Sequence, residues 1–287
     1  MSSMRQPARP SWRNTSSAAR YSRRRVSSLC FSLMGETLPG PMCTLVVCIR
    51  QYGAFPLIVA ANRDENLSRP ATGPRKWLDL PFVAPRDELA FGTWLGLTRS
   101  GLFVGVTNRF LAPKHEGRES RGQLVVEALQ APDATTLHTS LRTLSASRFN
   151  AFHLVYTDDT GAYVTWSDGE VVRHETLAPG LHIITERSLG GDDHARTSLI
   201  HERWPQLSPH GAVPTPEALQ GLLAATKPDD PLGGVCVEAP AFNYGTRSSM
   251  VLFQARDFAQ SRLWWADGRP DRTPFVERSE LVRELLA

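Results

Sequence analysis

The chain has 287 residues, of which 41% are hydrophobic and 21% charged, a composition typical of a folded domain with a sizeable core. No run approaches the roughly 18 apolar residues that a membrane helix needs, so no membrane span is expected. The formal charge of +3 is unevenly divided, because residues 1–41 carry seven Arg and one Glu, which leaves −3 for residues 42–287. This acidic remainder gives no electrostatic reason to expect nucleic acid as a partner.

Residues 1–41 are rich in Ser and Arg and have no apolar periodicity, so we exclude them from the fold. Three interpretations stay open: a misassigned start, with translation beginning at Met42; a disordered basic arm; or an export signal, since Ser22–Arg25 precedes the half-apolar run Val26–Met34. The expected organisation is an extension over 1–41 and a single domain over 42–287.

The four cysteines are too widely spaced for a metal site, and the chain has no CxxC, CxxCH or HExxH pattern, so no protein-bound metal or attached haem is expected. Cys43 and Cys48 fall in one predicted strand, where an odd separation places them on opposite faces. They are therefore expected not to pair. So few unclustered thiols suit a reducing compartment, and we expect a cytoplasmic protein.

The domain begins with two predicted strands, Thr44–Ile49 and Pro56–Ala61, both rich in β-branched and aliphatic residues. Four polar residues, 62–65, follow the second strand directly. We interpret them as a loop at the end of a sheet, where their side chains would reach a common site.

Further along the chain, Trp94–Thr98 and Leu102–Thr107 are predicted to form a hairpin around Arg99–Gly101. Strands are also expected at 151–156, 162–166, 181–185, 246–254 and 261–266, and helices at 122–130, 134–144, 193–203, 216–225 and 279–286. Asp192 and Thr215 are the expected caps of the third and fourth helices. Strands, then helices, then strands again indicate an α+β fold with mostly antiparallel sheets.

Six blocks in order resemble the NRDE family, also called the Transport and Golgi organisation protein 2 family: Met42–Leu45, Ala60–Glu65, Ser68–Pro70, Gly92–Gly96, Thr107–Asn108 and Tyr244–Ser248. Together they span nearly all of 42–287. The family in turn is similar to the N-terminal-nucleophile hydrolases, especially the cysteine branch of bile-salt hydrolases and penicillin V acylases. That resemblance implies an αββα sandwich of two mostly antiparallel sheets.

The resemblance also implies a catalytic set, because Cys43, Arg63, Asp64, Asn108 and Arg247 fall at matching places. The second oxyanion Asn of that branch has no clear counterpart here, and the nearest segment offers Glu186. The same blocks supply the candidate ligand-binding residues Asn62, Glu65, Trp94 and Tyr244.

The chemistry of these residue types suits acyl transfer. A free α-amine on Cys43 would act as the general base for its own thiol. Arg63 would lower the thiol pKa, and Asp64 would hold the α-ammonium. Asn108 would donate to an oxyanion, and Arg247 would position the site or bind a substrate carboxylate. The expected function is amidase or acyl-hydrolase activity on a small amide substrate, with no cofactor.

Structural interpretations compete with each of these roles. Cys43 would be a buried strand cysteine, Arg63 and Asp64 an ion pair, Asn108 a turn cap, and Arg247 a brace for a bend. Core packing is the alternative for Trp94, and an ion pair with Arg69 is the alternative for Glu65. A second functional hypothesis is a non-catalytic binding protein for a hydrophobic metabolite or haem, since the resemblance links the family to intracellular haem trafficking.

Overall fold

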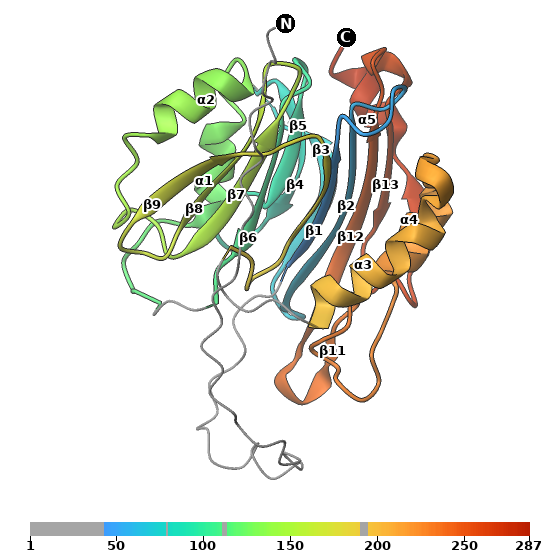
Figure 1. The fold of residues 1–287 in the computed structure, drawn as a ribbon. Helices are drawn as coiled ribbons and strands as arrows, with labels where there is room; N and C mark the ends of the chain where they lie inside the picture. Colours follow the sequence, from blue (N-terminus) through green and yellow to red (C-terminus); the bar gives the residue numbers. More distant parts are fainter. Residues whose placement is uncertain (1–42, 79, 111–113, 190–194) are drawn as a thin grey trace, which may run out of the picture. The chain divides into compact units, whose positions relative to one another are not determined.

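The computed structural model describes residues 43–287 except 79, 111–113 and 190–194. All of these lie in the second of the chain's two units, Pro39–Ala287. Its strands form two antiparallel sheets that face each other (Figure 1). The first sheet runs in the order β10 (Gly180–Ile184), β1 (Thr44–Ile49), β2 (Leu57–Asn66), β12 (Tyr244–Gln254), β13 (Arg262–Ala266) and β14 (Val276–Glu277), with β11 (Glu238–Ala239) also paired to β12.

The second sheet is a meander in chain order: β3 (Ala71–Lys76), β4 (Phe82–Asp87), β5 (Leu95–Thr98), β6 (Phe103–Asn108), β7 (Phe152–Thr157), β8 (Ala162–Ser167) and β9 (Val172–Thr176). Helices α1 (Arg121–Ala128) and α2 (Ala134–Leu141) lie on its outer side (Figure 1). Helices α3 (Ala195–Leu207) and α4 (Pro216–Leu223) cover the first sheet, and α5 (Ser279–Glu284) follows β14. Short 3₁₀ turns occupy Pro209–Gly211, Pro240–Phe242 and Phe258–Gln260.

The first sheet is buried on both faces, and the alternation along β1 shows how. Leu45 and Val47 enter the core between the sheets, whereas Val46 and Cys48 enter the core under α3 and α4. A strand buried on both sides reads as a continuous apolar run, because each face needs apolar side chains. The expected αββα sandwich is confirmed, and Cys43 and Cys48 are both free thiols, as expected.

One expectation about the site is wrong. Residues 62–65 do not form a loop, because β2 continues through them to Asn66. The extended neighbouring strand β12 pairs with this polar segment, from Tyr244 opposite Asn66 to Ser249 opposite Asn62. Backbone pairing therefore keeps these residues in the strand, and successive side chains point to opposite faces of the sheet.

Most other predicted elements are present, with ends shifted by a few residues. The hairpin turns at Gly101, whose φ of +84° suits glycine. Strands β3, β4, β9, β11 and β14 had no counterpart in the sequence-based prediction, because they are short and two of them contain a proline, Pro74 in β3 and Pro85 in β4. The Thr215 cap accepts from the Ala218 amide as expected. Asp192 lies outside the described residues.

Candidate active site

Cys43 lies directly before β1, on the face of the first sheet that looks toward the second sheet. Leu45, Ala61 and Met250 belong to the core between the sheets. Each lies two residues along its own strand from Cys43, Arg63 and Ser248, respectively, and therefore on the same face. Ser248 pairs with Arg63 in the register of β2 and β12. Three neighbouring strands thus bring Cys43, Arg63 and Ser248 to one edge of the space between the sheets, which we call the mouth.

Arg63 reaches across the mouth toward the second sheet. Its Nη2 lies 3.1 Å from Asp87 Oδ2 and 3.7 Å from Glu65 Oε2, and its guanidinium stacks 4.4 Å from the centre of the Trp94 ring. The Arg63 Nη1 is buried and has no hydrogen-bond partner among the described residues. Trp94 and Glu65 therefore join the site through Arg63, and Glu65 also lies 3.9 Å from Arg69.

Asp64 points the other way, into the layer under α3. Its Oδ1 accepts a 2.6 Å hydrogen bond from the Thr246 hydroxyl. Its Oδ2 lies 3.6 Å from Arg196 Nη1 but accepts no hydrogen bond within the described part of the chain. Arg196 also lies 3.4 Å from Glu186 Oε2. The negative charge of Glu186 is thus paired with Arg196 on the helix side of the sheet.

The titration of Cys43 and Asp64 reflects this burial. Desolvation raises the pKa of the Asp64 carboxyl to about 7, although Arg196 and Thr246 act in the opposite direction. The residue Cys43 is only partly buried, yet desolvation of its thiol and the charge of Asp64 raise the thiol pKa to about 12. Arg63 lowers that pKa as expected, but by less than burial raises it. In the chain that continues before Cys43, the thiol is therefore protonated at neutral pH.

Asn62 is saturated by structural contacts. Its amide donates to the Leu223 and Val235 carbonyls at 2.9 and 2.8 Å, and its Oδ1 accepts from the Ser249 hydroxyl at 2.6 Å. These bonds tie β2 to the end of α4 and to the segment after it. With both amide hydrogens and its oxygen engaged, Asn62 holds the fold, and its predicted role in binding ligand has no support from these contacts.

Asn108 ends β6 at the same end of the sandwich as Cys43. The two sheets approach closely nearby, since a Cβ on Gly105 would lie 3.1 Å from Leu45 Cδ2. Asn108 pairs with Phe152 in the strand register and is partly buried. Its neighbour Thr107 faces the first sheet, because its hydroxyl lies 3.4 Å from the Thr185 carbonyl. The role of Asn108 as an oxyanion donor stays a prediction.

Two predicted residues lie away from this group. The register of β2 and β12 shifts between Thr246 and Ser248, so Arg247 is the extra residue of a β-bulge. Its side chain is partly exposed and lies 3.1 Å from Asp267, not beside Cys43. Tyr244 packs with Val237 and Ala239 in a small cluster of its own.

Two arginines of the site were missed by the sequence-based prediction. Arg196 is 4% exposed and sits in a predicted helix whose sequence gives no sign that it would be buried. Arg121 begins α1, and its Nη1 donates to the Ala151 carbonyl at 3.0 Å. Burial lowers the Arg121 pKa to about 10, against the opposing effects of Cys43 and Glu65, which lie within electrostatic range. Neither residue belongs to a motif, so only the fold could reveal them.

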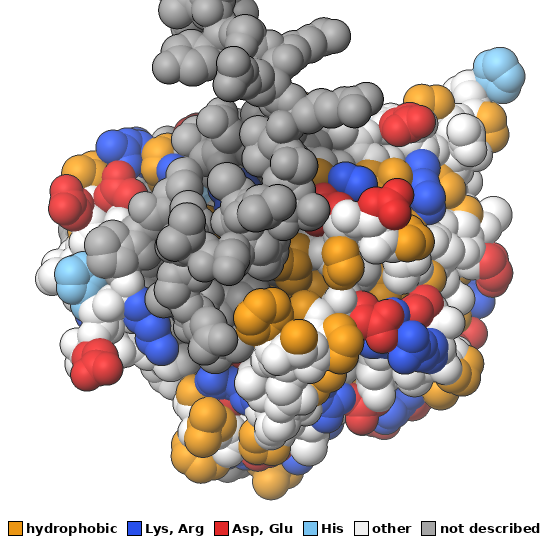
Figure 2. Space-filling view, turned by 90° about the horizontal axis from the view of Figure 1, so that it is seen from below, with side chains coloured by type: hydrophobic (Ala, Val, Ile, Leu, Met, Phe, Trp, Pro, Cys, Tyr) orange, Lys and Arg blue, Asp and Glu red, His pale blue; other side chains and the backbone are white. Residues whose placement is uncertain are grey.

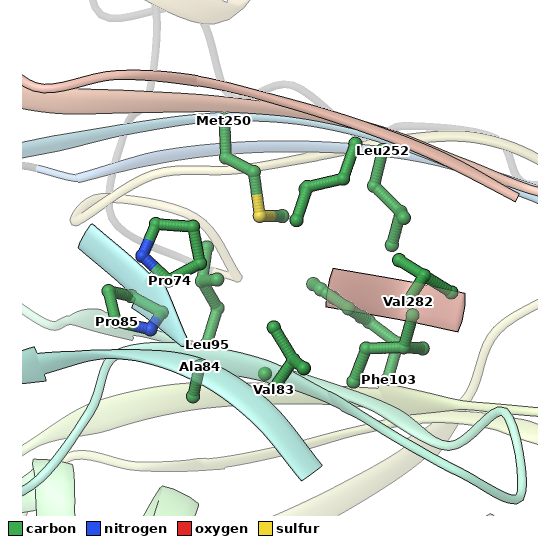
Figure 3. Close-up of a pocket in the computed structure, with 12 residues that line it drawn as sticks. Pro74, Val83, Ala84, Pro85, Leu95, Phe103, Met250, Leu252 and Val282 are labelled. Carbon is green, nitrogen blue, oxygen red and sulfur yellow. The ribbon is translucent and has the colours of Figure 1, made fainter. Parts of the chain in front are cut away.

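A small apolar cavity lies deeper between the sheets, among Met250 and Leu252 from β12, Val83 and Ala84 from β4, and Val282 from α5 (Figure 3). Its free volume is about 10 Å³, close to the minimum that one water requires. Met250 lies two residues along β12 from Ser248, which is one step deeper on the same face. The cavity therefore adjoins the mouth but is too small for a substrate, which must bind nearer the surface.

The surface at this end of the sandwich mixes charge with apolar side chains (Figure 2). Leu67, Leu89, Phe91 and Phe110 all have at least 39% of their surface exposed. They belong to the segments that follow β2, β4 and β6, the strands that end near Cys43. Within the described ranges, no cluster of three His, Cys, Asp or Glu could hold a metal ion, and no helix is long and apolar enough to cross a membrane.

The family model described as Transport and Golgi organisation 2 matches residues 42–262. The chain belongs to this family. It is 26% identical to the Transport and Golgi organization protein 2 homolog of Bos taurus over 234 residues, which cover 71% of this chain and 84% of the bovine protein. It is 30% identical to the human homolog over 110 residues, which cover 37% of this chain and 40% of the human protein.

Among solved structures, the fold of this Transport and Golgi organisation 2 member is similar to a Caenorhabditis elegans ortholog of N-acylethanolamine-hydrolyzing acid amidase. The TM-score is 0.50 at 12% identity, over 76% of this chain and 95% of the nematode chain. The fold is therefore that of the N-terminal-nucleophile hydrolases. A mutant of a conjugated bile acid hydrolase from Clostridium perfringens also matches, with a TM-score of 0.46 at 9% identity, over 83% of this chain and 93% of that one.

Proposed function

We propose that this protein is a cysteine amidase or acyl hydrolase that uses Cys43 as an N-terminal nucleophile on a small amide substrate. The observation that supports it best is the unsatisfied carboxylate of Asp64. This side chain is fully buried, and one of its oxygens has no hydrogen-bond donor among the described residues. It lies close enough to Cys43 for its charge to raise the pKa of the Cys43 thiol. An α-ammonium on Cys43 would be a charged donor beside that carboxylate, and its positive charge would favour the ionised form.

The reaction would proceed through a thioester. The free α-amine of Cys43, with a reference pKa of about 7.7–8.0, takes the proton of the thiol. The thiolate forms a C–S bond to the carbonyl carbon, and the oxyanion would be stabilised by Asn108. The C–N bond then breaks as the leaving amine takes the proton from the α-ammonium. Water, deprotonated by the α-amine, hydrolyses the thioester and restores the thiol.

Chemistry of this kind needs Cys43 to be the first residue, because in a longer chain its nitrogen is an amide. The intact mass of the native protein tests this requirement directly. A mass that corresponds to a chain beginning at Cys43 is expected. A mass that includes residues 1–41 would exclude the α-amine mechanism.

Thiol reactivity separates an activated cysteine from a buried one. In the longer chain Cys43 should react slowly with iodoacetamide at neutral pH, because burial raises the pKa of its thiol to about 12. In the chain that begins at Cys43, we expect this thiol to react at least about tenfold faster than in the longer chain. Mass mapping of the label gives each rate, and Cys43→Ala identifies the signal. Equal rates for Cys43 in the two chains would contradict the proposal.

The alternative function, a carrier of haem or another hydrophobic metabolite, stays a prediction. A cysteine thiolate or a histidine would be the expected haem ligand. Titration of the native protein with haemin distinguishes the two hypotheses. A saturable Soret shift that Cys43→Ala abolishes would favour the carrier. The hydrolase proposal expects no saturation.

A further inference from the structure

The mouth between the sheets holds more hydrogen-bond donors than acyl transfer by Cys43 requires. Arg63 Nη1 and the Ser248 hydroxyl are both buried, with residue exposures of 5% and 3%. Neither has a hydrogen-bond partner in the described part of the chain. Because Ser248 pairs with Arg63 across β2 and β12, the two unused groups are neighbours on one face. Buried donors without a partner are rare in folded proteins, and a bound ligand is one explanation for them.

Arg121, at the start of α1, adds a cation within electrostatic range of Cys43 and Glu65. It is partly buried, and its one hydrogen bond to a described residue goes to a neutral acceptor, the Ala151 carbonyl at the start of β7. No carboxylate of the described residues lies within 4 Å of its guanidinium, whereas Arg63 and Arg69 both pair with Asp87. Arg63 and Arg69 thus share the carboxylates of Asp87 and Glu65, and Arg121 has no carboxylate partner among the described residues.

The backbone around Arg121 fixes its position. A Cβ on Gly92 would lie 2.4 Å from the Gly122 carbonyl carbon, so these two glycines allow the start of α1 to touch the segment before β5. The Thr93 amide also donates to the Gly122 carbonyl at 3.2 Å. Trp94, which stacks on Arg63, is the next residue. Arg121 and Arg63 are therefore held on two rigid elements that are joined at this contact.

We propose that the mouth contains an anion-binding subsite in which Arg121, Arg63 and Ser248 hold a carboxylate or phosphate group of the substrate. A partly desolvated guanidinium without a counterion is unfavourable, and a bound anion offsets that loss with charge-assisted hydrogen bonds. The lowered pKa of Arg121 agrees with a cation that is buried without a matching charge. The substrate class of the proposed amidase is then an acyl amide that carries an anionic group.

The inference rests on the proposed function for the identity of the acyl group, but binding can be tested without turnover. The probes are hexanoylglycine, which carries a carboxylate, hexanoyl-aminomethylphosphonate, which carries a phosphonate, and neutral hexanoylglycinamide. Each is titrated calorimetrically into the native protein with Cys43→Ala, which removes the nucleophile. At least one anionic probe should bind about tenfold or more tightly than the neutral amide, and which one it is identifies the anion. The preference should shrink as salt is added.

Variants assign the preference to Arg121. In the Cys43→Ala background, Arg121→Gln should make the anionic and neutral probes bind equally, and Arg121→Lys should restore part of the difference. Arg118→Gln is the matched control, because Arg118 lies three residues earlier and also bonds to backbone carbonyls, those of Phe149 and Gly169. It should leave the preference unchanged. Thermal unfolding of each variant shows whether it is folded.

The outcomes separate this inference from the proposed function. Equal binding of charged and neutral probes, no binding of any probe, or a preference that survives Arg121→Gln in a folded variant would each overturn the subsite. If the protein with Cys43 intact hydrolyses hexanoylglycinamide as fast as it hydrolyses the anionic amides, the proposed amidase activity stands and the anion-binding subsite is rejected. An anion preference in a protein that hydrolyses no amide would retain the subsite and reject the amidase.

Discussion

The two faces of the first sheet differ in which kind of polar group lacks a hydrogen-bond partner. On the helix side, Asn62 has all of its side-chain hydrogen bonds and Arg196 contacts two carboxylates, but the acceptor Asp64 Oδ2 has no donor among the described residues. On the side of the mouth, Arg63 and Ser248 retain buried donors without partners in the residues described. One strand, β2, supplies both sets, because its side chains alternate.

The difference indicates a division of labour within one short motif. Asn62 and Asp64 belong to the layer that holds α3, α4 and the sheet together, whereas Arg63 and Glu65 face the mouth. Substitutions on the helix side should therefore act mainly on stability. Those on the side of the mouth should act mainly on binding and reaction, because unsatisfied groups contribute little to the folded state.

The largest expected effect is that of Arg196→Met. The substitution removes the cation that Asp64 and Glu186 share and leaves Glu186 only a 3.9 Å contact with Arg187. Removing one partner of a buried ion pair destabilises by about 3–5 kcal/mol. Urea unfolding measures the change. Arg247→Gln is the control, because it breaks a partly exposed pair with Asp267 and should lose less than about 1 kcal/mol. Similar losses for the two variants would contradict the assignment of Arg196 to a buried network.

A smaller, pH-dependent effect is expected for Asp64→Asn. The pKa of Asp64 is raised to about 7 in the folded chain, so the folded state binds this proton more tightly than the unfolded state does. The stability that the protonated carboxyl contributes is present at low pH and is lost as the pH rises through about 7. The advantage of the variant over the parent should therefore grow by about 2–3 kcal/mol between pH 5 and pH 9.

The length of the chain sharpens this test. In a chain that begins at Cys43, the α-ammonium would favour the ionised carboxylate, so the gain from Asp64→Asn should disappear. The measurement is urea unfolding of both chains at the two pH values. A gain of the same size in both chains would show that Asp64 does not interact with the α-amine.

The smallest effects compare adjacent serines of β12 that face opposite sides. Ser249→Ala removes the donor to Asn62 Oδ1 and should destabilise by about 1–2 kcal/mol, because that oxygen is left buried and unsatisfied. Ser248→Ala removes a hydroxyl that has no partner among the described residues and should change stability by less than about 0.5 kcal/mol. Ser248→Ala should instead weaken binding of the anionic probes. A larger stability loss for Ser248 than for Ser249 would reverse the assignment of the two faces.

The sequence predicted the architecture well, since apolar runs and turn residues determine which segments form strands and helices. It predicted Cys43, Arg63 and Trp94 as site residues, and in the structure the Arg63 guanidinium stacks on the Trp94 ring. It could not show that β2 continues through Asn62–Glu65, because polar residues after an apolar run look like a loop unless the pairing strand is known. The sequence could not predict Arg121 and Arg196 as site residues, since their burial depends on contacts between segments that are distant in the chain.

The bulge at Arg247 has a consequence for comparing relatives. In a regular strand, residues two apart face the same side. The extra residue breaks this rule, so Thr246 faces the helix side and Ser248 faces the mouth. A relative without the bulge would present a different residue of the Tyr244–Ser248 block to the mouth, even if the letters matched. Roles within the family should therefore be transferred by counting strand partners and not by reading down an alignment column.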